Sequence, residues 1–183
     1  MSMFERVNQA EAISAETIAR HQNAVPQELA AVWREQGAGL IGDGFVRVVD
    51  PDRALSMLDG VVGLNSSAVP VFTTALADVI VYIEPAYHLI QFRYGVIDFL
   101  AFDSPKFFAD LQDETFLDQI LARQPYPAGV ARLGVPGLDE CFGFVPLLAL
   151  GGQEDAANLD RGGLWEHIAV IIRFAGPPAP RRR

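Results

Sequence analysis

Cysteine and lysine are almost missing from this sequence. The single cysteine, Cys141, excludes an intrachain disulfide and any zinc site built on several cysteines. Lys106 is the only lysine, and 14 Lys and Arg stand against 23 Asp and Glu, a formal net charge of −9. Three of the cations are Arg181–Arg183, so the rest of the chain carries 11 cations against 23 carboxylates, or −12. Such a surface repels phosphate backbones, which excludes non-specific nucleic-acid binding, and it attracts a basic partner.

Long hydrophobic runs are absent as well. No stretch of 18 apolar residues occurs, which predicts that no segment spans a membrane. Residues 1–5 have neither the basic start nor the apolar run of a secretory signal, so we expect the reducing cytoplasm as the location. Half of the residues are hydrophobic, enough for a sizeable core in one domain or in a core with a small appendage.

Capping residues predict three helices in the first third of the chain. Ser14 is a good N-cap for a helix to about residue 21, and Pro26 suits the first position of a helix that ends at Gly37. Asp50 and Pro51 start a helix through about residue 58. Between the last two helices we expect a glycine-rich turn over residues 37–44 and a strand over 45–49.

The middle of the chain is rich in strand patterns, and its last third ends in a helix. Strands are predicted over 69–73, 79–83, 88–94 and 97–102. Two helices start at residues 104 and 113, and a final helix over 163–174 carries an apolar stripe that must pack on the rest of the chain. Strands that cluster, rather than alternate with helices, predict an α+β fold with an antiparallel central sheet flanked by helices.

Proline and glycine suggest the boundaries. A Pro- and Gly-rich stretch over residues 125–137 suggests a main region of 1–124 and a C-terminal region of 125–175 packed on it. We expect residues 176–183 to be a loose tail because prolines dominate it.

One glycine motif matches a cofactor fingerprint by letter only. Residues 37–42 read Gly-Ala-Gly-Leu-Ile-Gly, the G-x-G-x-x-G pattern of dinucleotide sites. That site needs a strand before the motif and a helix after it, whereas here a helix precedes and a strand follows. The motif therefore predicts a turn between a helix and a strand, and we expect no cofactor.

No catalytic or metal constellation emerges from the remaining residues. The three histidines form no H-x-x-x-H or H-x-H pair, there is no G-x-S-x-G elbow, and the carboxylates beside Cys141 raise rather than lower a thiol pKa. Four carboxylates in the strand-rich region suit solvated charges that protect sheet edges: Asp78, Glu84, Asp98 and Asp103. A small hydrolase that uses Asp78 or Glu84 with His88 is the weakest of the alternatives.

Two segments resemble known families. Glu28 to Pro51, with Trp33-Arg34, a Gly-Ala-Gly turn and Asp50-Pro51, resembles the start of the GAD-like domain. Phe144 to Leu159, with Pro146, Gly151-Gly152 and Asn158, followed by Glu166-His167, resembles the C-terminal domain of type VI secretion immunity proteins. Together they cover about residues 26–174. The family often carries A-F-G-D where this chain has Ala75 to Asp78, so a glycine of one turn is replaced here by Ala77.

The resemblance implies a non-catalytic immunity protein whose partner is a cognate effector toxin, a basic nuclease domain that attacks DNA. The acidity of the chain fits that expectation because an acidic protein can occupy a DNA-binding surface by mimicking phosphate charge. The candidate contacts lie in expected loops, where side chains are free to reach a partner. They are Asp43, Glu84, Glu154 and Asp155. Three alternatives remain: the chain binds elsewhere on the toxin and distorts it, a hydrophobic patch carries the contact, or the chain is a regulatory module with another partner.

Overall fold

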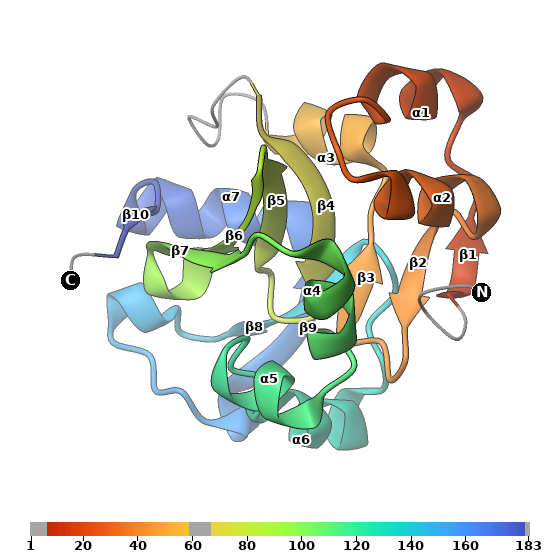
Figure 1. Cartoon of the computed structure of the whole chain (residues 1–183). Helices are drawn as coiled ribbons and strands as arrows, with labels where there is room; N and C mark the ends of the chain where they lie inside the picture. Colours follow the sequence, from red (N-terminus) through yellow and green to blue (C-terminus); the bar gives the residue numbers. More distant parts are fainter. Residues whose placement is uncertain (1–6, 59–66, 182–183) are drawn as a thin grey trace.

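An eight-stranded sheet organises the chain (Figure 1). The computed structural model describes residues 7–58 and 67–181. Within them the strands of the sheet lie in the order β1-β2-β3-β4-β5-β6-β7-β10, and every pair is antiparallel except β7 and β10. The bounds are β1 Val7–Glu11, β2 Ala38–Ile41, β3 Val46–Val48, β4 Val69–Thr74, β5 Val79–Ile83, β6 Ala86–Gln91, β7 Val96–Ala101 and β10 Ala179–Pro180.

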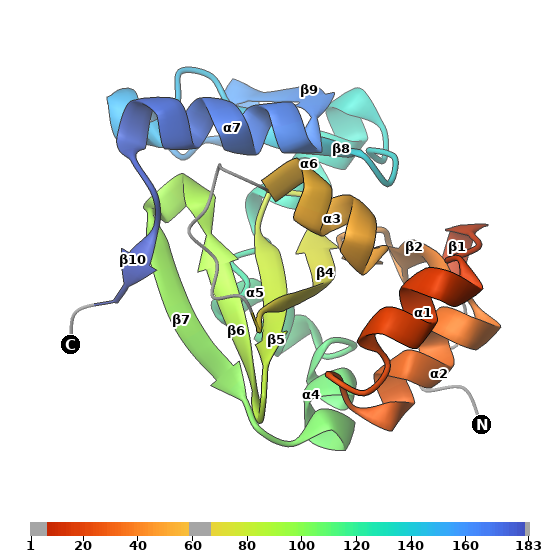
Figure 2. The ribbon, with the colours of Figure 1, turned by 90° about the horizontal axis from the view of Figure 1, so that it is seen from above.

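Helices cover both faces of this sheet, and a two-stranded sheet of β8 and β9 packs beside it (Figure 2). Figure 2 shows α3 and α7 on one side and α4 and α5 on the other. The small sheet has β8 Glu140–Phe144 and β9 Leu159–Gly163. The helices are α1 Ala15–His21, α2 Gln27–Glu35, α3 Pro51–Leu58, α4 Ser104–Asp110, α5 Glu114–Gln119, α6 Pro125–Leu133 and α7 Leu164–Ala175, with short 3-10 turns η1 Phe92–Tyr94, η2 Leu148–Leu150 and η3 Ala156–Asn158. The α+β prediction with a mostly antiparallel central sheet is confirmed.

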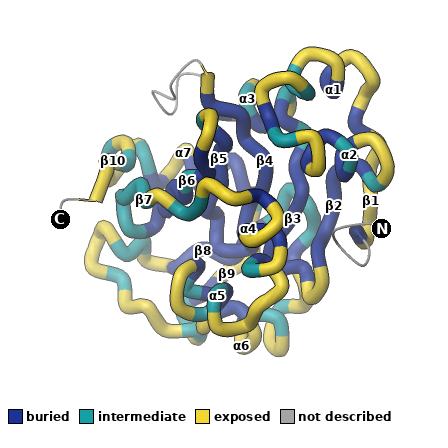
Figure 3. Tube along the Cα trace, viewed as in Figure 1, coloured by how far each residue is buried: buried dark blue, intermediate teal, exposed yellow. Residues whose placement is uncertain are grey.

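Two hydrophobic clusters fill the space between the layers. The larger joins one face of the sheet to α2, α4, α5 and α6 and is rich in aromatic side chains such as Trp33, Phe72 and Tyr87. The smaller joins the opposite face to α3 and α7 through Val79, Ile90 and other aliphatic side chains. Figure 3 shows the central strands buried and the outer turns of the helices exposed. Burial of strands on both faces explains the unbroken apolar run of β5.

The final helix packs on the sheet through its predicted stripe. Leu164, Ile168 and Ile171 of α7 are buried in the smaller cluster, and Ile172 packs against it half-buried. We expect Ile168→Ala to lower the free energy of unfolding by about 2–5 kcal/mol, because Ile168 is 1% exposed and the change leaves a cavity. Val170→Ala is the control, since Val170 is 43% exposed on the same helix. Urea unfolding of both variants measures the effect, and equal stabilities would contradict the packing.

Local capping accounts for the helix starts that the sequence predicts. The Ser14 hydroxyl accepts a hydrogen bond from the Thr17 amide at 3.0 Å. The Asp50 carboxylate accepts from the Asp52 amide at 3.0 Å, and the Asp113 carboxylate from the Phe116 amide at 2.9 Å. Each cap satisfies an N–H group that the first turn leaves free.

The glycine-rich segment differs from its prediction. Residues 38–41 form strand β2 rather than a turn, and β1, which the sequence did not predict, pairs with it. A Cβ on Gly37 would lie 2.2 Å from the Glu11 carbonyl oxygen, and one on Gly39 would lie 2.5 Å from a Val7 methyl. The first two glycines of the motif therefore permit the close approach of β1, and no nucleotide is needed to explain them.

The region after residue 124 contains more regular structure than its composition suggests. Residues 125–133 form α6, with two prolines in its first turn, where proline is tolerated. Tyr126 of α6 packs in tilted contacts against Phe45 and Phe142, with ring centroids at 5.2 and 5.9 Å, so residues on both sides of the predicted boundary share one core. The boundary at 124 stays a prediction.

The tail is also less loose than predicted. Ala179 and Pro180 form β10, which runs parallel to β7 and pairs with Val96 and Ile97. The Ala179 amide donates to the Gly95 carbonyl, and the Arg181 amide donates to the Ile97 carbonyl, each at 3.1 Å. A proline-rich segment can form this strand because, at the edge of a sheet, only every second residue donates its amide to the neighbouring strand. Pro180, which has no N–H, lies between the two donors Ala179 and Arg181.

A buried arginine links β3 to the C-terminal region. Arg47 has no exposed surface, and its guanidinium donates to four backbone carbonyls. The acceptors are Gly44 at 2.7 Å, Glu140 at 3.0 Å, Thr74 at 3.2 Å and Pro136 at 3.4 Å. Burial lowers the pKa of Arg47 to about 10, so the side chain stays charged at neutral pH.

Candidate functional site

Asp43 occupies the turn between β2 and β3. Its carboxylate accepts a hydrogen bond from the Phe45 amide at 3.0 Å, which fixes the turn, and its side chain is 50% exposed. The Tyr126 hydroxyl of α6 donates to the Asp43 carbonyl at 2.7 Å, so α6 also fixes this turn. The turn is thus rigid while its carboxylate remains available to a partner.

A single arginine gathers three carboxylates beside this turn. Arg123 is 8% exposed, and its guanidinium lies 2.8 Å from Asp118, 3.4 Å from Asp43 and 3.9 Å from Glu114. A hydrogen bond with Asp118 is the main cause that raises the pKa of Arg123. Three negative charges face one positive charge, so the cluster remains acidic. It borders a hollow of about 380 Å³, which we call the Asp43 pocket, lined also by Gln112 and Leu117.

A second hollow runs along β7 on the other side of α5. This β7 groove has a volume of about 590 Å³. Leu89, Leu100 and Ile120 supply its apolar lining, and Tyr94, Asp98 and Arg181 its polar rim. Because α5 lines both hollows, the Asp43 pocket and the β7 groove flank one helix.

Exposed aromatic side chains lie on the face of β7 turned away from Leu89 and Leu100 of the groove, because Phe99 pairs with His88, whose partner Val81 belongs to the smaller cluster. Phe99 is 52% exposed and Phe102 67% exposed, and their ring centroids are 4.6 Å apart. Ile120, in the lining of the groove, is 47% exposed. Apolar side chains grouped in this way mark sites of interaction with other molecules.

The predicted Glu154 and Asp155 follow the 3-10 turn η2. Glu154 is exposed and accepts a hydrogen bond from the Tyr94 hydroxyl, which places it at one end of the β7 groove. Burial, together with the charge of Glu154, raises the pKa of Tyr94, so its hydroxyl keeps its proton. Asp155 accepts from the Ala157 amide at 2.8 Å and caps η3. Asp155 is exposed.

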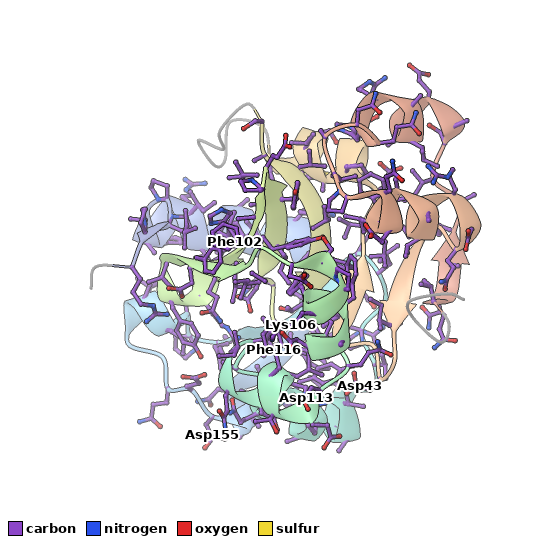
Figure 4. All side chains as sticks on the ribbon, in the orientation of Figure 1. Asp43, Phe102, Lys106, Asp113, Phe116 and Asp155 are labelled. Atoms are coloured by element: carbon purple, nitrogen blue, oxygen red, sulfur yellow. The ribbon has the colours of Figure 1, made fainter. Side chains whose placement is uncertain are left out.

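The four predicted contacts do not converge on one spot. Figure 4 shows Asp43 and Asp155 on either side of α5. Glu84 is exposed in the turn between β5 and β6, and neither the Asp43 pocket nor the β7 groove includes it. Sequence reasoning missed Arg123, Phe99 and Phe102. Phe99 and Phe102 both lie in the strand predicted over 97–102, but nothing in its pattern marks their side chains as exposed, and no motif singles out Arg123.

Asp78 corrects one prediction. It is not a solvated edge charge: it is fully buried and paired with Arg93 at 3.0 Å, and the Thr74 hydroxyl also donates to it. Arg93 in turn donates to the carbonyls of Leu121 at 2.9 Å and Ala122 at 3.3 Å. The pair therefore joins the sheet to the end of α5.

In the turn before Asp78, Ala77 stands where the family often has a glycine. Ala77, which replaces it, keeps a left-handed backbone with φ of 62°. Glycine adopts that conformation without cost, so the turn survives the substitution with some strain.

Stability should depend on pH through Asp78. Burial raises the pKa of Asp78 to about 6, above its unfolded value of 3.8. The folded protein therefore binds this proton more tightly than the unfolded chain, so the contribution of Asp78 to stability is full below pH 3.8 and is lost as pH rises through about 6. Between those values, the stability of the wild type should fall with rising pH relative to Asp78→Asn, which has no proton to lose. Urea unfolding at several pH values measures this difference, and parallel curves would contradict it.

The hydrolase alternative lacks its geometry. Asp78 contacts Thr74 and Arg93, whereas His88 packs on the Phe99 ring with centroids at 6.1 Å, and Glu84 is exposed. Within the described residues no contact joins these three side chains. Burial lowers the pKa of His88, which keeps it neutral at pH 7.

The structure adds three findings on other kinds of site. Cys141 is buried, and burial is the main cause that raises its pKa to about 12, ahead of the neighbouring carboxylates that the sequence suggested. Among residues 7–58 and 67–181, no group of three or more His, Cys, Asp or Glu side chains is placed to hold a metal ion. In the same part of the chain, no helix is long and apolar enough to cross a membrane.

Comparisons with known proteins match both halves of the chain. The family described as "GAD-like domain" matches residues 1–92, and the family described as "T6SS immunity protein Tdi1, C-terminal" matches residues 101–174. The crystal structure of Atu4351 from Agrobacterium tumefaciens has a similar fold, with a TM-score of 0.73, 16% identity and coverage of 92% of this chain and 84% of that one. A search of curated proteins gives no significant match.

Proposed function

We propose, from the premise that this chain belongs to the GAD-like domain family and carries the C-terminal region of the type VI secretion immunity protein Tdi1, that it binds and inhibits a cognate toxin with nuclease activity. The two matches support an immunity role of the type VI secretion system. The observation that carries the proposal is their occurrence in tandem on one continuous core. Inhibition is by protein–protein contact and needs no cofactor.

The contact surface is the side of the molecule on which α5 lies, with the Asp43 pocket on one flank and the β7 groove on the other. Many carboxylates elsewhere are neutralised by cations of the same chain, such as Glu16 and Asp52 by Arg20. In the Asp43 pocket, by contrast, one arginine serves three carboxylates. Glu154 and Asp155, beyond the β7 groove, have no ion pair among the described residues. This side therefore presents an excess of negative charge.

A nuclease is the toxin class that fits such a surface. An enzyme that binds DNA carries cationic side chains to neutralise phosphates. An acidic face steers that surface toward itself and competes with DNA for it. The apolar side chains of the β7 groove, Leu89, Leu100 and Ile120, add apolar contact area, which slows dissociation of the partner once the charges have brought the two proteins together.

Co-expression tests the proposal. The gene next to this one should encode a secreted protein whose C-terminal domain is toxic when produced in bacterial cytoplasm. Production of this chain should restore growth, and the two proteins should co-purify. Cells that die despite production of this chain would contradict the immunity role.

The nuclease assignment has a separate readout. Purified toxin should degrade plasmid DNA, and this chain should suppress the degradation at equimolar concentration. A toxin that is neutralised but leaves DNA intact would contradict the nuclease assignment alone. A neighbouring gene with no toxic product would favour a regulatory module with another partner.

A further inference from the structure

Strand β7 is an edge strand for most of its length. On one side it pairs with β6 from residue 96 to residue 101. On the other side β10 covers only Val96 and Ile97. Within the described residues, Asp98 to Ala101 have no strand on that side. Figure 3 shows that β7 and β10 are more exposed than the central strands.

The hydrogen-bonding groups of this edge point outward at known positions. The Ile97 carbonyl accepts from the Arg181 amide, so the peptide groups of residue 97 face the open side. Backbone groups alternate along a strand, and the register pairs Ile97 with Ile90 and Phe99 with His88. The N–H and C=O of Phe99 therefore face the open side as well, next in line after those of Ile97.

Native sheets usually protect such an edge with charge, proline or an irregularity. The β7 edge has an irregularity opposite Tyr87 and His88, and β10 contributes Pro180, but its exposed side chains include Phe99 and Phe102. Next to them lies the β7 groove, with room for the side chains of an added strand. Open backbone groups beside an apolar groove are the two requirements for binding a peptide as an extra strand.

The contacts of the tail indicate which type of side chain binds at the β7 edge. Arg181 forms a forked ion pair with Asp98: Nε lies 2.8 and 3.1 Å from the two carboxylate oxygens, and Nη2 lies 2.9 Å from one of them. A forked pair of this kind selects a guanidinium. Glu154, at the Tyr94 end of the groove, adds a further negative charge.

We propose that an extended, arginine-containing segment of the toxin adds to the β7 edge as a strand, with its arginine on Asp98 in the place that β10 and Arg181 now occupy. The inference rests on the proposed function and names the contact through which the toxin is held. The tail is a placeholder that leaves readily, because β10 has two residues, both exposed, and Arg181 is itself 57% exposed.

Hydrogen exchange of the complex with the neighbouring gene's product, inactivated in its own active site, tests the inference directly. Amides of β7 should exchange more slowly in the complex, the Phe99 amide most of all, while the amides of Ala179 and Arg181 exchange faster. A toxin that binds without these changes would overturn the inference and leave the proposed function standing. A chain that binds no toxin would overturn both.

Two variants at Phe99 separate the contribution of its backbone N–H to toxin binding from that of its side chain. Phe99→Ala and Phe99→Pro both remove the ring, but only the second removes the outward N–H, which an edge strand tolerates losing. We expect Phe99→Pro to weaken toxin binding about tenfold more than Phe99→Ala does, because a tenfold difference corresponds to the loss of one hydrogen bond. Phe174→Ala, on α7 and 59% exposed, is the control and should bind as the wild type does. Equal binding by the two Phe99 variants, both folded by circular dichroism, would contradict strand addition.

Removal of the tail should strengthen toxin binding, whereas the Phe99 variants should weaken it. A chain that ends at residue 177 retains α7 and lacks β10 and Arg181. If the tail competes for the edge, this chain should bind the toxin about threefold to tenfold more tightly, because the open state no longer has to be reached first. Asp98→Asn in the same chain should cancel the gain. Weaker binding by the shortened chain would mean that the tail itself contacts the toxin, and would overturn the exchange.

Discussion

Replacing Arg47 with methionine is expected to lower the free energy of unfolding by about 3–5 kcal/mol, the range for breaking a buried charged network. Methionine fills much of the volume but donates no hydrogen bond. The carbonyls of Gly44, Pro136 and Glu140 would each lose a donor, and an unsatisfied buried acceptor costs about 1–3 kcal/mol. Relief of the desolvation of the guanidinium offsets part of that cost.

Arg53→Met is the matched control for this change. Arg53 is 42% exposed and pairs with Glu11 and Asp139 at the surface, where an ion pair contributes less than about 1 kcal/mol. Thermal and urea unfolding of both variants measure the effect. Arg47→Lys should fall between wild type and Arg47→Met, because one ammonium group cannot reach four carbonyls. A Met variant as stable as the Arg53 control would show that the four hydrogen bonds add little to the fold.

Reversal of Glu154 and Asp155 to lysine is expected to slow association with the toxin about tenfold at low salt, within the range of electrostatic steering. Both side chains are exposed and lack ion pairs among the described residues, so the change alters the electrostatic field and removes two local hydrogen bonds, those from the Tyr94 hydroxyl and the Ala157 amide, but no salt bridge. Dissociation should change less, because charges at the rim act mainly on the encounter.

The control carries the same change in net charge at other places. Glu35→Lys with Asp160→Lys alters two exposed residues outside the Asp43 pocket and the β7 groove. Stopped-flow association at low salt and at about 1 M salt, where the screening length falls to about 3 Å, separates steering from contact. Wild-type rates that stay flat with salt, or a control as slow as the reversal, would favour the alternative in which the apolar β7 groove alone carries recognition.

Short-range features of the structure follow from the sequence alone. Ser14, Asp50 and Asp113 start their helices because an N-cap bonds an amide two or three residues away. The run of β5 and the stripe of α7 predict buried elements because their periodicity matches the geometry of a strand and a helix. The resemblance of residues 28–51 and 144–167 predicts the family for the same reason, since a motif is a local pattern.

Contacts between residues far apart in the sequence determine the features that could not be predicted from the sequence. Arg47 reaches Glu140 across 93 positions, Arg123 reaches Asp43 across 80, and Arg181 reaches Asp98 across 83. Asp78 reads as a surface charge until β6 and η1 bring Arg93 beside it. The strand identity of residues 38–41 and of the tail depends likewise on neighbours supplied by β1 and β7. Local propensity cannot register a partner that only the folded chain brings within hydrogen-bond distance, and the candidate face beside α5 is built from such partners.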